Sequence, residues 1–140
     1  MANCIFCKII DRELPAHVVF EDDQAIAFLD IKPLFAGHTL VVPKEHHVTL
    51  ADLPADQVEP LFAKARQLSA VMPEALEAGG TFVAMNNIVS QSVPHLHIHV
   101  VPRSKGDGLR GFFWPRTDYD SDEHAAVTAA TLGAAYTNVS

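Results

Sequence analysis

The sequence predicts an α+β domain in which a five-stranded antiparallel sheet carries one long helix and a C-terminal helix. Three observations support this fold class. Short apolar or β-branched segments are bounded by turn residues, helical periodicity is confined to two stretches, and the elements follow the order β, β, β, α, β, β, α. Strands that follow one another in sequence usually pair. The 140 residues, 49% of them hydrophobic, are enough for one domain with a buried core.

The first part of the chain predicts a short helix and three strands. The apolar segment at residues 4–10 indicates one or two helical turns. Pro33 cannot continue a strand ladder, and Gly37 precedes a run rich in β-branched residues. The three strands are expected at residues 17–21, 24–30 and 38–43.

Apolar residues at helical spacing predict a long helix over residues 54–78. Pro60 and Pro73 each remove a backbone donor, so we expect a kink at one or both, or a helix that begins only at Pro60. The pair Gly79-Gly80 is the expected end of the helix.

The last elements are two strands and a helix. The fourth strand is expected at residues 81–86 and should pair with the fifth, which begins near residue 95. A final helix is expected over residues 123–136, with Asp120 or Ser121 as its cap. Its apolar side chains suggest that it docks on its own sheet or on a second subunit.

Three histidines alternate with aliphatic residues in the fifth strand. Alternate side chains of a strand share a face, whereas a helix would spread the imidazoles around its circumference. Leu96, Ile98 and Val100 are expected to face the core, and the opposite face carries His95, His97 and His99. Three imidazoles on one strand face indicate a functional site.

Two chemistries fit such a row. A neutral imidazole that donates its hydrogen through one ring nitrogen keeps a free lone pair on the other, with which it can attack phosphorus. His97, flanked by the other two, is the geometric choice for this nucleophile, and Gln91 and Ser92 can contact a phosphate oxygen. Alternatively, His-x-His on a strand is a zinc-binding geometry, and the spacing does not separate the two.

Cys4 and Cys7 have the spacing of half a zinc site. His46, His47 and His95 are the candidates for the remaining ligands. A redox dithiol and two buried small side chains are the alternatives. A thioredoxin-like role is disfavoured because no βαβ pattern surrounds the pair.

Asp30 ends an apolar strand, where its carboxylate can accept hydrogen bonds from ribose hydroxyls or simply form the turn. A second set of residues can enclose a purine or belong to the core: Phe6, Ile9, Phe28 and Ile31.

The formal net charge of −7, with scattered basic residues, disfavours a nucleic-acid or membrane-surface partner. No apolar run reaches the length of a membrane span, and the N-terminus lacks the layout of a secretion signal. We therefore expect a cytoplasmic protein with reduced thiols.

Residues 95–101 match the signature His-φ-His-φ-His-φ-φ of the histidine triad (HIT) family. Further segments are similar to HIT segments in the same order, at residues 4–10, 28–31, 37–46 and 91–93. The chain therefore resembles a HIT protein of the bacterial type with an N-terminal Cys-x-x-Cys. The resemblance implies one HIT domain over residues 1–140, with a signature-bearing core at 4–103 and a C-terminal extension at 104–140. One departure is Ser90, where most relatives have glycine.

This resemblance implies a nucleotide hydrolase or transferase that cleaves a nucleoside 5′-phosphoryl bond. The substrate would be a phosphoramidate or a dinucleoside polyphosphate, and the intermediate a nucleotidyl-histidine. His97 would attack phosphorus, with His99 and His95 assisting. The purine nucleotide would be held by Asp30 at the ribose, by Gln91 and Ser92 at the phosphate, and by Phe6, Ile9, Phe28 and Ile31 around the base.

The resemblance also implies a homodimer and a structural zinc ion, with no organic cofactor. The zinc ligands would be Cys4, Cys7, His46 and His95. A zinc-bound His95 cannot also serve the phosphate freely, so we expect it to orient the site from behind. The alternatives are a nucleotide-binding partner or sensor protein with little turnover, and a hydrolase with its metal on the triad.

Overall fold

The computed structural model describes residues 3–110 and 116–138. The chain divides into two compact units, Met1–Asp107 and Gly108–Ser140, of which the first contains the whole sheet. Trp114 lies outside the described residues. Within the described part of the chain, no helix combines the length and the apolar character needed to cross a bilayer.

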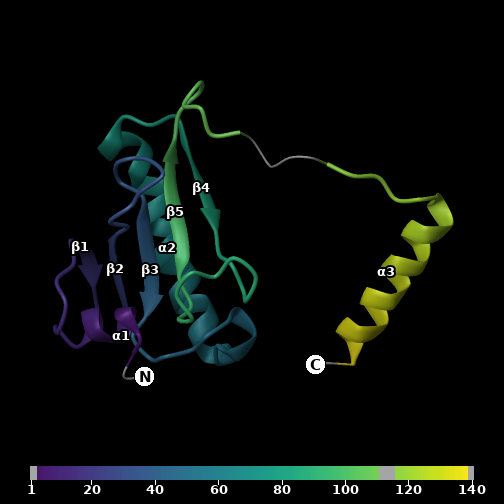
Figure 1. The fold of residues 1–140 in the computed structure, drawn as a ribbon, viewed down its shortest axis with the longest axis horizontal. Helices are drawn as coiled ribbons and strands as arrows, with labels where there is room; N and C mark the ends of the chain where they lie inside the picture. Colours follow the sequence, from purple (N-terminus) through teal and green to yellow (C-terminus); the bar gives the residue numbers. More distant parts are fainter. Residues whose placement is uncertain (1–2, 111–115, 139–140) are drawn as a thin grey trace. The chain divides into compact units, whose positions relative to one another are not determined.

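The first unit is built on a five-stranded antiparallel sheet in the order β1-β2-β3-β5-β4, which confirms the predicted fold class (Figure 1). Its strands are β1 (Val18–Glu21), β2 (Ala25–Leu29), β3 (Thr39–Pro43), β4 (Gly80–Ala84) and β5 (Ile98–Arg103). The strand β5, which contains His99, is therefore an inner strand, paired on both sides.

Helices cover both faces of the sheet. The long helix α2 (Ala55–Leu76) packs on the face that carries Leu96, Ile98 and Val100, so the predicted core face of the histidine segment is confirmed. The short helix α1 (Ile5–Ile10) packs Phe6 and Ile9 on the opposite face, which is the face of the histidines (Figure 1). A 3-10 turn, η1 (Leu50–Asp52), precedes α2.

The histidine segment is less regular than predicted. The ladder between β3 and β5 ends at the pair Val41 and Ile98, so only His99 of the triad lies within β5. Just before the strand, the Leu96 backbone N–H donates instead to the carbonyl of His47, at 2.7 Å. His95 and His97 therefore precede the regular strand.

The long helix lies within the predicted range of residues 54–78. It begins at Ala55, so the alternative start at Pro60 is wrong, and it continues through both prolines. It ends at Leu76, before the two glycines, because Glu77 adopts a left-handed conformation with φ of 54°. The backbone N–H of Ala78 then bonds back to the carbonyl of Pro73. Such a left-handed cap closes a helix without requiring glycine.

The second unit contains α3 (Asp122–Thr137). Of the two caps predicted from the sequence, Ser121 is the one observed, since its Oγ accepts the backbone N–H of His124 at 3.0 Å. Asp122 and Glu123 lie in the first turn, where the helix dipole favours negative charge.

Gly37, just before β3, should be intolerant of a side chain. Its φ is 104°, and a Cβ atom would overlap Cδ1 of Leu76. We expect Gly37→Ala to lower the free energy of unfolding by about 1–3 kcal/mol in urea titrations. Gly80→Ala is the matched control, because its Cβ would meet no atom within 4 Å. Equal stability of the two variants would contradict this account of Gly37.

Candidate active site

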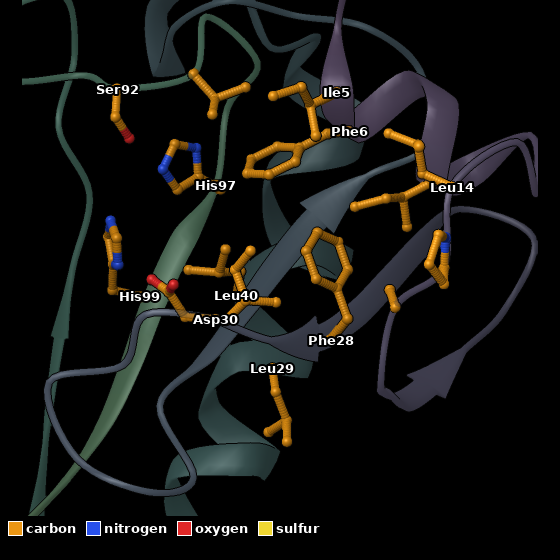
Figure 2. Close-up of a pocket in the computed structure, with 15 residues that line it drawn as sticks. Ile5, Phe6, Leu14, Phe28, Leu29, Asp30, Leu40, Ser92, His97 and His99 are labelled. Carbon is orange, nitrogen blue, oxygen red and sulfur yellow. The ribbon is translucent and has the colours of Figure 1, made fainter.

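Two of the three triad histidines line the same cavity, which has a volume of about 330 Å³. Figure 2 shows His97 and His99 at one end of it, near Ser92 and Asp30. His95 is fully buried and does not line the cavity. The triad is therefore divided between two environments.

The rest of the cavity wall is apolar. Phe6 and Phe28 form an edge-to-face pair with ring centroids 5.3 Å apart, and Figure 2 places both at the end away from His99. All four residues predicted to surround a purine line the cavity: Phe6, Ile9, Phe28 and Ile31. Asp30 and Ser92 line it as well. The cavity thus has a polar end and an apolar end of the kind that a nucleotide requires.

Gln91 was predicted to contact phosphate, but its side chain is engaged in its own loop. Its Nε2 donates to the carbonyl of Val48 at 2.6 Å, and its Oε1 accepts the backbone N–H of Ile88 at 2.9 Å. Gln91 does not line the cavity. In this conformation its side chain holds the loop that leads to Ser92.

The same loop contains two residues in a left-handed conformation. Ser90 has φ of 63° and Ile88 has φ of 72°. Glycine adopts such a backbone without steric cost, which gives a physical reason for the glycine that the resemblance places at position 90. The chain therefore keeps this loop geometry in spite of the serine.

The tautomer of His97 is fixed by a backbone group. Its Nδ1 lies 2.7 Å from the carbonyl oxygen of His95, and a carbonyl can only accept. Nδ1 therefore carries the hydrogen, and Nε2 of the neutral ring holds a free lone pair. The ring of Phe6 stands perpendicular to that of His97, with centroids 5.0 Å apart, and limits its rotation.

Two further hydrogen bonds fix the tautomer of His99. The backbone N–H of Leu34 donates to Nδ1 of His38 at 3.1 Å, so the hydrogen of the neutral His38 ring lies on Nε2. That Nε2 donates to Nδ1 of His99 at 2.9 Å. Nε2 of His99 is thereby left as an N–H donor. The triad thus presents one acceptor, on His97, and one donor, on His99.

His38 is a site residue that the sequence analysis missed. It is 4% exposed and lies 3.7 Å from Oδ2 of Asp30 through its Nε2. The sequence contained a signal for His38. Positions 38 and 40 are two apart in the predicted third strand, so His38 shares a face with Leu40, which lines the cavity. Asp30 forms the turn considered for it, because its Oδ1 accepts the backbone N–H of Lys32 at 2.9 Å, and the residue also lines the cavity.

Burial keeps these imidazoles neutral. Desolvation, followed by the nearby His97 and His38, lowers the pKa of His99 to about 4. Desolvation likewise lowers the pKa of His38, and it outweighs the opposing effect of Asp30. At neutral pH both rings are therefore uncharged, as the hydrogen bonds described above require.

The Asp30, His38 and His99 cluster is compact enough to suggest a metal, with ligand atoms within 4.8 Å of one another. However, a metal on Nε2 of His38 would place the ring hydrogen on Nδ1, against the N–H of Leu34 that donates to it. The hydrogen-bond pattern therefore argues against a metal at this position.

A second cluster fits zinc. Sγ of Cys4 lies 3.3 Å from Nδ1 of His95, Sγ of Cys7 lies 3.2 Å from Nδ1 of His46, and the two Nδ1 atoms are 3.1 Å apart. Tetrahedral zinc ligands at about 2.0–2.3 Å from the metal are about 3.3–3.8 Å from one another. Nε2 of His95 donates to the carbonyl of Pro43 at 2.8 Å, which leaves its Nδ1 lone pair directed at the sulfurs. The four donors therefore match a structural zinc site.

Comparison with known proteins identifies the fold and the motif. The HIT domain matches residues 11–106. An uncharacterised HIT-like protein of Methanocaldococcus jannaschii is 42% identical over 122 residues, 86% of this chain and 94% of the relative. The adenosine 5′-monophosphoramidase of Candida albicans is 35% identical over 127 residues, 85% of this chain and 84% of the relative.

Two solved structures are also similar. A HIT family protein from Bacillus anthracis has a TM-score of 0.85 and 31% identity, with 95% of this chain and 96% of that chain covered. A zinc-bound histidine triad family protein from Mycobacterium smegmatis has a TM-score of 0.74 and 36% identity, with 98% of each chain covered.

The zinc site can be tested with two neighbouring histidines. His46 belongs to the cysteine cluster, whereas the ring of His47 contacts Glu45 instead. We expect purified protein to hold about one zinc per chain, His46→Ala to lose most of it, and His47→Ala to keep it. Metal content by plasma emission spectrometry measures this. Equal zinc content in the two variants would refute the assignment.

Acid should destabilise the fold through His99. Its pKa is about 4 when folded against 6.5 for the free side chain, so between these values the unfolded chain binds a proton that the folded chain does not. The free energy of unfolding should therefore fall as pH falls from about 6.5 towards 4. Urea titrations should show a smaller fall for His99→Asn than for wild type. Parallel pH profiles would contradict the prediction.

Proposed function

Because this chain belongs to the HIT domain family, we propose that it cleaves a nucleoside 5′-phosphoryl bond through a covalent intermediate on His97. One observation carries the proposal. The hydrogen bond from Nδ1 of His97 to the His95 carbonyl leaves Nε2 as a free nucleophile at the polar end of the cavity.

The cavity suggests how a nucleotide would lie. The base occupies the apolar end, against Phe6 and Phe28, and the ribose hydroxyls reach the carboxylate of Asp30. The phosphorus atom then lies before Nε2 of His97. Ser92 and the Nε2–H of His99 are placed to donate hydrogen bonds to the phosphoryl oxygens or to the leaving group.

The reaction proceeds in two displacements. The Nε2 lone pair of His97 bonds to phosphorus as the bond to the leaving group breaks, and water then releases the nucleotide from the ring. The ring becomes positively charged while it carries the nucleotide, and the His95 carbonyl stabilises this charge through the Nδ1 hydrogen bond. His95 acts through this carbonyl, and a zinc ion on its ring would have a structural role.

The charge of the cavity favours a phosphoramidate over a dinucleoside polyphosphate. Among the described residues that line it there is no lysine or arginine, and Asp30 adds a carboxylate. Neutral imidazoles and a hydroxyl suit the single negative charge of an adenylated amine better than a multiply charged polyphosphate chain. The Candida albicans relative bears the name of an adenosine 5′-monophosphoramidase, which is consistent with this choice.

The proposal includes the protein's surroundings. We propose a cytoplasmic homodimer that holds structural zinc, uses no organic cofactor and has neither nucleic acid nor a membrane as its partner. Its two cysteines are free, as a reducing compartment requires, and its net charge is −7.

Replacement of His97 separates catalysis from binding. We expect His97→Ala to lower turnover of an AMP-amine conjugate by about three or more orders of magnitude, because the nucleophile is lost. AMP binding by calorimetry should remain, since the apolar end is unchanged. Turnover that survives the replacement would eliminate the covalent mechanism. Binding of AMP with no turnover by the wild type would favour a sensor protein.

The charge of the cavity predicts a preference between the two substrates. Under the same conditions, kcat/KM should be at least about tenfold higher for an AMP phosphoramidate than for diadenosine tetraphosphate. The measurement is a chromatographic assay of both substrates. Preference for the tetraphosphate would show that cationic groups outside the described cavity wall set the specificity.

A further inference from the structure

The cysteine cluster joins three segments that also shape the cavity. Cys4 and Cys7 belong to the N-terminal segment, His46 follows β3, and His95 precedes β5. These segments are far apart in sequence and each supports a different part of the cavity. A metal ion in the cluster would therefore hold all three at once.

The first of these segments is one wall of the cavity. Helix α1 has only six residues, and a helix of that length is not stable on its own. Phe6 lies between the two cysteines and contacts both His97 and Phe28 by edge-to-face packing. Ile5 and Ile9 of the same helix also line the cavity. Whatever fixes the cysteines thus fixes this wall.

The segment after His46 supports the loop that leads to Ser92. The Val48 carbonyl accepts the amide of Gln91 at 2.6 Å, and the backbone N–H of Leu50 donates to Oδ1 of Asn87 at 2.7 Å. This loop includes the left-handed residues described above, so it depends on such external contacts for its shape.

The third segment reaches the nucleophile directly. The ring of His95 is held between the cluster and the Pro43 carbonyl, and the His95 backbone carbonyl accepts Nδ1–H of His97. A metal ligand and the ring that faces the nucleotide are thus separated by a single residue, Leu96.

We propose that a metal ion on Cys4, Cys7, His46 and His95 and a nucleotide in the cavity strengthen each other's binding. This inference rests on the nucleotide-binding function proposed above. Without the metal, a nucleotide must order α1 and the loop at its own cost, whereas with the metal they are already in place. Thermodynamic linkage then requires that the bound nucleotide raise the affinity for the metal by the same factor.

Zinc release tests the coupling without an activity assay. Zinc-loaded wild-type protein is mixed with the chromogenic chelator 4-(2-pyridylazo)resorcinol, with and without saturating AMP. We expect zinc removal to raise the dissociation constant of AMP about tenfold, and AMP to slow zinc release. If AMP binds with the same dissociation constant with and without zinc, the coupling is refuted and the proposed function stands. If AMP does not bind at all, both fail.

A matched pair of variants tests the route through α1. Phe6→Leu and Phe28→Leu each remove one ring of the same aromatic pair, but only Phe6 lies between the cysteines. At saturating AMP, the slowing of zinc release should persist in Phe28→Leu and fall by more than half in Phe6→Leu. Equal slowing in both variants would overturn α1 as the connection.

Discussion

The hydrogen bond from His97 to the carbonyl of its neighbour two residues earlier is the constraint on which the site depends. It requires that the His95 carbonyl be free of the sheet ladder, and it is free because the pairing of β3 with β5 ends at Ile98. A regular strand from residue 95 would engage such carbonyls in pairing with the neighbouring strand. The irregular start of β5 is therefore what sets the tautomer of the central histidine.

Backbone hydrogen bonds also fix the other histidine rings around the site. A backbone group decides the tautomer of each ring: the Pro43 carbonyl for His95, and the Leu34 N–H for His38 and, through it, for His99. Burial lowers the pKa of His95 and of His99 to about 4, so both rings stay neutral. A buried polar network that is fully paired is rigid. The protein thus presents a donor and an acceptor in fixed positions without any charged residue other than Asp30 in the described cavity wall.

The period-two alternation predicted the faces of the histidine segment, because it depends only on local geometry. Leu96 and His97 therefore lie where the sequence placed them. Parity could have placed His38 on the same face as Leu40, but the role of His38 arises only when β3 pairs with β5. The side chain of Gln91 was likewise set by a distant carbonyl, that of Val48, which no local pattern announces. Local rules predicted the elements and the resemblance predicted part of the cavity wall, whereas tertiary hydrogen bonds determined how His38, His99 and Gln91 are held.

The most direct test is the tautomer of His97 in solution. Long-range ¹H–¹⁵N correlation spectra of uniformly ¹⁵N-labelled protein at pH 7, with His97→Gln to assign the ring, distinguish a protonated from an unprotonated ring nitrogen. The account predicts that Nδ1 of His97 carries the hydrogen and that Nε2 has the shift of a free lone pair. A hydrogen on Nε2 with Nδ1 unprotonated would contradict it, because the nitrogen that faces the nucleotide would then have no electrons to offer.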